Sequence, residues 1–156
     1  MKAPTTQREM GAPDLLRAAG LSGQAMRAVS FASILEAGND GAIPGRAGAY
    51  LIVTVADGHV IGIGSSGSGP KRKGTLAARV GTFVAAALGF PVKHSSGRRF
   101  WTTRSAHGLR LRDLAVVCLP ADDPRGMECK LFDAYEDATG RLPMLCKARP
   151  SRRERA

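Results

Sequence analysis

The sequence contains few cysteines and no long apolar run. Its three cysteines, Cys118, Cys129 and Cys146, are odd in number and lack the paired spacing of zinc ligands. This excludes a disulfide framework and most structural zinc sites. Residues 1–13 are polar and lack the apolar centre of a signal peptide. No apolar run approaches the length that spans a bilayer, so we expect a cytoplasmic protein without a membrane partner.

Acidic residues are absent from one long stretch of the chain. Basic and acidic residues cancel within residues 1–70 and again within 113–156. The net charge of +10 therefore comes from residues 71–112, whose charged side chains are Lys71, Arg72, Lys73, Arg79, Lys93, Arg98, Arg99, Arg104, Arg110 and Arg112.

Such a cluster of positive charge is typical of a surface that binds a polyanion. Nucleic acid is the favoured polyanion, because its arrayed phosphates release counterions to clustered Lys and Arg. The alternative is a solvated basic face or a patch for an anionic membrane. The membrane version is disfavoured because we expect no amphipathic basic helix in residues 71–112.

The chain has the length and composition of one folded domain. It has 156 residues, of which 44% are hydrophobic, and about 150 residues bury enough surface to fold without covalent staples. Asp57-Gly58 is typical of a hairpin turn, and Asp123-Pro124 is typical of a helix start. We expect an α/β (α+β) fold with a central mixed or antiparallel sheet of about three strands flanked by helices. The predicted strands are 50–55, 59–63 and 114–119, and the predicted helices are 14–20, 22–36, 76–88 and 124–138.

Several apparent motifs do not carry a function. The glycine string of residues 62–67 lacks the adjoining helix and the following acidic residue of a dinucleotide site. Residues 69–75 lack the lysine of a phosphate-binding loop. His59, His94 and His107 show no ligand spacing, and we interpret them as surface or structural histidines.

Four short motifs follow one another in a recognisable order. They are Gly48-Ala49-Tyr50-Leu51-Ile52, Gly62-Ile63-Gly64-Ser65-Ser66, a helix that carries Arg79, and a helix that opens with Glu128. Together with the closing segment 140–146, this order resembles the GIY-YIG nuclease domain over residues 43–147. The stretch 43–48 is similar to restriction endonucleases of that superfamily. Residues 1–42 would then form an N-terminal tail with a helical extension, and 148–156 a basic polar tail.

The resemblance implies an endonuclease that hydrolyses DNA and depends on a divalent metal; RNA is not excluded as substrate. Glu128 would bind Mg²⁺ or Mn²⁺, and Arg79 would stabilise the phosphate oxygens. Tyr50, near Lys71 or Lys73, would have a lowered pKa and act as a base or position the water. Turns and strand pairing place Tyr50 across from Ser65.

Further residues of the basic stretch would contact the nucleic acid. Phe100 and Trp101 lie among arginines and could stack on bases, or the Trp could instead anchor a small core. The expected contact residues are Lys71, Arg72, Lys93, Arg98, Arg99, Trp101 and Arg104.

Two departures from the motif bear on activity. Gly62 stands where a Tyr is usual, and Cys146 stands where an Asn is usual. Ser65 or Lys73 could substitute for the missing polar groups. The alternative is a catalytically degenerate nucleic-acid-binding module of the same fold, and a third interpretation is a basic accessory protein. A single site cuts one strand at a time, so the protein would act as a monomer that nicks or as a homodimer.

Overall fold

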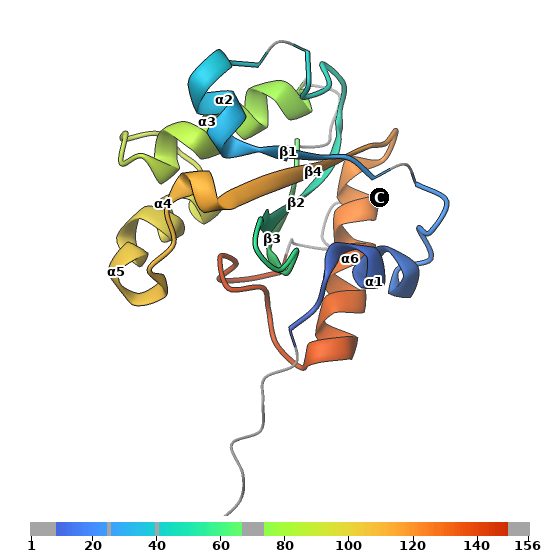
Figure 1. Cartoon of the computed structure of the whole chain (residues 1–156). Helices are drawn as coiled ribbons and strands as arrows, with labels where there is room; N and C mark the ends of the chain where they lie inside the picture. The colour runs from blue at the N-terminus through green and yellow to red at the C-terminus, as the bar shows by residue number, and fades with distance from the viewer. Residues whose placement is uncertain (1–8, 25, 40, 67–73, 150–156) are drawn as a thin grey trace, which may run out of the picture.

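The computed structural model describes residues 9–24, 26–39, 41–66 and 74–149 of the chain (Figure 1). Along the chain, a hairpin of two strands is followed by a run of helices before the last strand and the last helix. The strands are β1 (Ala28–Ser30), β2 (Gly48–Thr54), β3 (Val60–Ser65) and β4 (Leu114–Pro120). The helices are α1 (Ala12–Ala18), α2 (Phe31–Ala37), α3 (Leu76–Ala87), α4 (Ser95–Thr102), α5 (Arg104–His107), the 3-10 turn η1 (Leu111–Asp113) and α6 (Pro124–Thr139).

The four strands of the described residues form one antiparallel sheet in the order β1-β4-β2-β3. The α+β class predicted from the sequence is confirmed, with one strand more than the three expected. β2 and β3 are joined by a turn over residues 55–58, longer than the predicted two-residue turn at Asp57-Gly58, and Gly58 has a φ of 70°. Because β3 pairs on one side with β2 alone, it forms one edge of the sheet.

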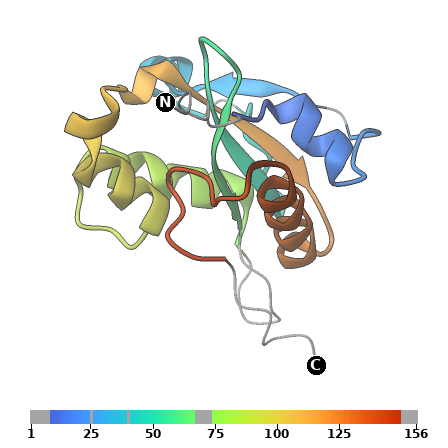
Figure 2. The same ribbon diagram turned by 90° about the horizontal axis from the view of Figure 1, so that it is seen from below.

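Helices cover both faces of this sheet (Figure 2). Side chains alternate along β2, so Leu51 and Val53 pack against α1 and α6, whereas Tyr50 and Ile52 pack towards α2, α3 and α4. The segment before residue 43 belongs to the same core, because Leu15 of α1 is fully buried in the first cluster and Phe31 of α2 is fully buried in the second.

One predicted helix is wrong. Residues 28–30, expected inside a helix over 22–36, form β1 and pair with β4. The helix that follows begins at Phe31, because the Ser30 side chain accepts a hydrogen bond from the backbone N–H of Ser33. The β-branched Val29 packs into the core beneath the sheet edge, which favours the strand.

Residues 95–107, for which no element was predicted, form α4 and α5. The expectation that this stretch contains no amphipathic basic helix is wrong, because α4 buries Gly97 and Phe100 and directs Arg98 outward. α4 lies directly against α3: a Cβ on Gly97 would come within 2.7 Å of the Phe83 carbonyl oxygen. This close contact fixes the start of α4 beside the sheet.

The other predicted elements are confirmed with small changes in their ends. The Thr75 side chain caps α3, and the Asp123 side chain caps α6 by accepting from the backbone N–H of Gly126. Gly140 ends α6 in the left-handed conformation. No helix of the described ranges is long and apolar enough to cross a membrane.

Candidate active site

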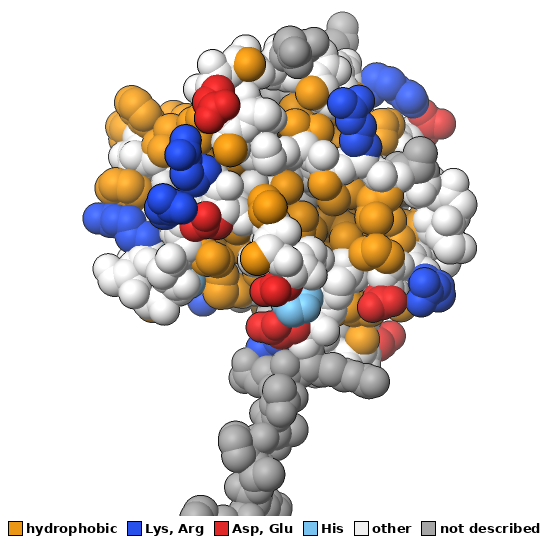
Figure 3. All heavy atoms as spheres, in the orientation of Figure 1, with side chains coloured by type: hydrophobic (Ala, Val, Ile, Leu, Met, Phe, Trp, Pro, Cys, Tyr) orange, Lys and Arg blue, Asp and Glu red, His pale blue; other side chains and the backbone are white. Residues whose placement is uncertain are grey.

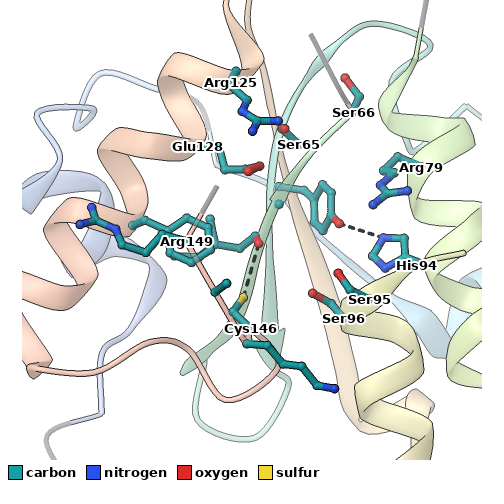
Figure 4. A pocket seen from close by; sticks show the side chains of 16 residues that line it. Ser65, Ser66, Arg79, His94, Ser95, Ser96, Arg125, Glu128, Cys146 and Arg149 are labelled. Carbon is teal, nitrogen blue, oxygen red and sulfur yellow. Dashed lines mark hydrogen bonds between the residues drawn. The ribbon is translucent and has the colours of Figure 1, made fainter. Parts of the chain in front are cut away.

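A pocket of about 390 Å³ opens at the β3 edge of the sheet. α6 lies on one side of it and α3 with the start of α4 on the other, and the segment after α6 runs between them (Figures 2 and 4). Its lining includes Tyr50, Gly64, Ser65, Ser66, Arg79, His94, Ser95, Ser96, Arg125, Glu128, Cys146, Lys147 and Arg149. Four residues that the sequence singled out, Tyr50, Ser65, Arg79 and Glu128, therefore meet in one pocket although they come from four elements.

Tyr50 is buried at the base of the pocket. Its ring lies across Gly64, the residue opposite it on β3, and a Cβ at position 64 would overlap the ring. The phenol oxygen lies 3.0 Å from Nε2 of His94 (Figure 4). The glycine in the second motif thus provides the space that the Tyr50 side chain occupies.

The expected pairing of Tyr50 with Ser65 is wrong by one residue. The turn closes with Thr54 opposite His59, which displaces the register by two residues from that of a two-residue Asp57-Gly58 turn. The bulge between Ile52 and Val53 restores one of these two residues, so Ser65 lies opposite Ala49. This places the Ser65 side chain on the α6 side, beside Glu128, whose pKa it lowers (Figure 4).

The expected lowering of the Tyr50 pKa is also wrong. Burial raises the pKa of the Tyr50 phenol, and the nearby Arg79 guanidinium offsets this rise only in part by charge and by hydrogen bonding. Lys71 and Lys73, which were expected to lower it, lie outside the described residues, as does Arg72, which was expected to contact nucleic acid. A phenol with a raised pKa keeps its proton at neutral pH.

His94 caps α4 and contacts Tyr50 at the same time. Its Nδ1 accepts a hydrogen bond from the backbone N–H of Gly97 at 3.2 Å. Burial and the positive charge of Arg79 lower the pKa of His94 to about 3, so the imidazole is neutral. The sequence interpretation of a structural histidine misses its contact with the pocket.

Glu128 brings a carboxylate into the pocket from the first turns of α6. Its exposed fraction is 8%, and burial raises its pKa, while Ser65, Arg125 and Arg79 act in the opposite direction. Arg79 acts by its charge on both Glu128 and Tyr50, and it lies on the α3 side of the pocket, across from Glu128 on the α6 side (Figure 4). A ligand held here would contact all three groups.

The two departures from the motif have distinct consequences. A side chain on Gly62 would point at Ile52 and Leu145, whose atoms lie 3.2 to 3.6 Å from an added Cβ, and Gly62 does not line the pocket. Cys146 does line it, and its thiol donates to the Ile63 carbonyl oxygen at 3.6 Å. Burial raises the pKa of Cys146, which keeps it a thiol at neutral pH.

The donor groups of the pocket fit a weakly held, hydrated divalent ion. Among the described residues, no three or more His, Cys, Asp or Glu side chains cluster as a complete metal site. Mg²⁺ commonly keeps several waters and binds one or two carboxylates together with substrate phosphates. The Glu128 carboxylate beside the Ser65 hydroxyl matches this pattern.

The residues expected to contact nucleic acid lie mainly on α4 and beside it. Lys93, Arg98 and Arg104 are exposed, whereas Arg99 is half-buried and donates through Nε to the Met144 carbonyl oxygen at 2.9 Å. Figure 3 shows basic, apolar and acidic side chains together at its left, on the side of the molecule where α3, α4 and α5 lie in Figure 1. Trp101 of α4 is on this side, with an exposed fraction of 37%.

The aromatic residues of this side differ from those expected. Phe100 is 3% exposed and stacks on His107, so it belongs to the core and does not contact a ligand. The Arg104 guanidinium lies 3.7 Å from the centre of the Trp101 ring, forming a cation–π pair. Phe90, which the sequence reading did not single out, is 61% exposed and follows Gly89, which the Trp101 ring covers.

Comparison of the chain with protein-family models, with curated proteins and with solved structures gives no match. The resemblance to GIY-YIG nucleases therefore depends on the motifs, and the functional assignment depends on the pocket.

Proposed function

We propose that the protein is a divalent-metal-dependent endonuclease that hydrolyses phosphodiester bonds of nucleic acid, with DNA as the favoured substrate. The observation that carries this proposal is the convergence of Tyr50, Arg79 and Glu128 in one pocket, with Ser65 beside Glu128. Burying a carboxylate next to a guanidinium and a phenol costs free energy, and the stability of the fold does not require it. Such groups therefore indicate a functional site.

The cationic lining of the pocket suits a phosphodiester. Arg79, Arg125 and Lys147 line it. Arg125 is on α6 and acts by its charge on Glu128, whereas Arg79, on the opposite side, can place two parallel N–H donors on phosphate oxygens as negative charge grows. Arg149 is committed to Asp133 and Glu136 on α6, so it orders the rim. Arg79 is therefore the side chain that would bind the reacting phosphate.

Glu128, assisted by Ser65, would hold the divalent ion. When bound, Mg²⁺ or Mn²⁺ supplies positive charge at the phosphate and at the leaving oxygen. Burial raises the pKa of Glu128, and a cation beside the carboxylate would offset the cost of burying its charge. Burial of Glu128 keeps its position fixed for the ligand.

A plasmid assay tests the proposal. Supercoiled DNA is incubated with the full chain in Mg²⁺ or Mn²⁺, and in EDTA. We expect metal-dependent nicking that falls by about 10²-fold or more in Glu128→Gln, and in Arg79→Lys because the guanidinium fork is lost. Asp137→Asn is the matched control, because Asp137 is exposed on the same helix and does not line the pocket. Cleavage that persists in EDTA or in Glu128→Gln would contradict the proposal.

The second candidate is a nucleic-acid-binding module without catalysis. Cys146 favours it, because a thiol cannot replace the donor and acceptor functions of an amide. This candidate predicts salt-sensitive DNA binding with no cleavage, and the same binding by Glu128→Gln. A basic accessory protein would show neither binding nor cleavage.

The number of active sites in the monomer or homodimer determines whether cleavage gives nicked or linear DNA first. One pocket per chain acts on one strand, so a monomer would give nicked circles before linear DNA. A homodimer would give linear DNA in one encounter. Light scattering with and without DNA distinguishes the two states.

A further inference from the structure

We propose that the Tyr50 hydroxyl serves the pocket as a proton donor to the leaving oxygen, and that His94 is the positioning residue that directs it there. This inference rests on the proposed nuclease function and assigns Tyr50 the role opposite to that of a base. It follows from the two hydrogen bonds of one buried imidazole.

The α4 cap determines which nitrogen of His94 carries the proton. The Gly97 N–H donates to Nδ1, so Nδ1 presents its lone pair and carries no hydrogen. A neutral imidazole has one N–H, which is then on Nε2. The close packing of Gly97 on Phe83 and Ala86 fixes this N–H, and with it the tautomer.

The Nε2–H group therefore donates to Tyr50. Nε2 lies 3.0 Å from the phenol oxygen, and with a hydrogen on Nε2 the oxygen is the acceptor. The Arg79 guanidinium lies nearby and acts on the phenol by its positive charge. A phenol oxygen has one proton and two lone pairs, so the lone pair that faces Nε2 is occupied by the His94 donor.

The Tyr50 proton must then point away from the His94 Nε2–H group. Among the described residues, no acceptor for this O–H group is found, and the Tyr50 side chain lines the pocket. The charged or titratable groups that act on Tyr50 are Arg79, Glu128 and Cys146. Burial favours the protonated phenol, which suits a donor and opposes a base.

The proton balance of the step is complete. A water oxygen forms a bond to phosphorus, and the bond from phosphorus to the leaving oxygen breaks. The leaving oxygen takes the Tyr50 proton, while the attacking water releases a proton to solvent. The resulting phenolate is stabilised by Arg79 and by the His94 Nε2–H, and solvent returns its proton.

The opposite tautomer would give a different site. With a proton on Nδ1, the Gly97 N–H would face another N–H group. Nε2 would then carry no hydrogen and would accept a hydrogen bond from the Tyr50 O–H group. Tyr50 would then be occupied by His94 and unavailable to a ligand. The helix cap is thus the feature that decides between the two arrangements.

NMR on the ¹⁵N-labelled full chain reads the tautomer directly. The His94 signals are identified by their absence in His94→Asn. We expect them to show a protonated Nε2 and an unprotonated Nδ1, and this protonation state should not change from about pH 5 to 8. A hydrogen on Nδ1, or titration of His94 within this range, overturns the proposal whether or not the protein cleaves DNA.

Two substitutions separate the cap from the donor. His94→Asn keeps a cap acceptor but does not reach Tyr50, and His94→Gln keeps an amide N–H near the Nε2 position. We expect His94→Asn to lower the cleavage rate about tenfold, the equivalent of one hydrogen bond, and His94→Gln to recover part of it. If both variants lost the same fraction of the cleavage rate, and this fraction equalled their loss of folded protein, His94 would have a structural role alone.

A double-mutant cycle with Tyr50→Phe tests whether His94 acts through the phenol. Tyr50→Phe alone should lower the rate by about 10²-fold or more. In that background His94→Asn should cost less than about twofold, because the group it positions is gone. Additive effects overturn the positioning role.

Failure of the proposed nuclease is distinguishable from failure of this inference. If the wild-type protein does not cleave, the same cycle is measured on the dissociation constant for inorganic phosphate. Non-additive weakening by Tyr50→Phe and His94→Asn then supports the donor role, and unchanged binding in both overturns it.

Discussion

The buried imidazole of His94 couples stability to pH. In the unfolded chain it titrates near 6.5, whereas in the folded protein burial and Arg79 lower its pKa to about 3. Below pH 6.5 the unfolded state therefore binds a proton that the folded state does not. The stabilisation is complete above pH 6.5 and is lost as the pH falls towards 3.

This linkage gives a measurable slope. We expect the free energy of unfolding of the wild type, relative to His94→Asn, to fall between pH 6 and 4 by up to ~1.4 kcal/mol per pH unit. Urea denaturation of both proteins across that range measures it, and the difference removes the contribution of the carboxylates. A difference that stays constant from pH 7 to 4 would contradict the buried, neutral histidine.

Gly64 makes room for the Tyr50 ring. Gly64→Ala places a methyl group where the ring lies, so the ring must move or the strands must separate. We expect a loss of ~1–3 kcal/mol in the free energy of unfolding, together with loss of cleavage. Gly81→Ala is the control, because Gly81 is exposed on α3 with no atom near an added Cβ, and there Ala should stabilise by ~0.4–1 kcal/mol. Equal stability of the two variants would show that position 64 is not crowded.

The sequence was enough to predict that several residues share the pocket. It was not enough to predict how their pKa values shift or how they pair. Tyr50, Arg79 and Glu128 follow from motif order, and they share the pocket. The sign of the Tyr50 pKa shift could not be predicted, because it depends on burial beneath α3 and α4. His94 was missed because its partners, Gly97 N–H and Tyr50, form no spacing pattern of ligand type.

At the scale of elements, strong hydrophobic patterns gave correct predictions and weak ones did not. α3 and α6 have several large apolar residues and clear caps. α4 buries Ser96, Gly97 and Phe100 and exposes Arg98, so its helical period comes from basic residues set against small ones, and only Phe100 among the buried residues is large and apolar. β1 has three residues and gains its strand conformation by pairing with β4.

The outer face of α4 provides a test of ligand contact. Trp101→Ala removes a partly exposed ring that forms a cation–π pair with Arg104. We therefore expect weaker binding to a DNA duplex or single strand by ~1–3 kcal/mol. The fold should persist. The neighbouring Phe100→Ala instead empties a core position and should cost ~3–5 kcal/mol of stability. Gel shifts and urea denaturation of both variants measure this. Unchanged affinity in Trp101→Ala would exclude α4 from the interface.

At the scale of the whole molecule, the positive charge is unevenly compensated. Arg149 pairs with Asp133 and Glu136, and Arg110 pairs with Asp113. Lys93 and Arg98 are exposed in the stretch of the chain that contains no acidic residue. Because His94 and Ser95 of the pocket lie between them in the chain, charge next to the pocket is available to a polyanion.

The salt dependence of binding locates this interface. Each phosphate neutralised by the protein contributes about −0.9 to the slope of log K against log salt concentration. We expect Lys93→Gln with Arg98→Gln to reduce the slope by about 2. Lys130→Gln removes one exposed charge from α6, outside the acid-free stretch, and should leave the slope nearly unchanged. Fluorescence titration with a DNA duplex at several salt concentrations measures all three slopes. If Lys130→Gln reduced the slope and the double variant did not, the duplex would bind across α6. The prediction that it contacts α4 next to the pocket would then be wrong.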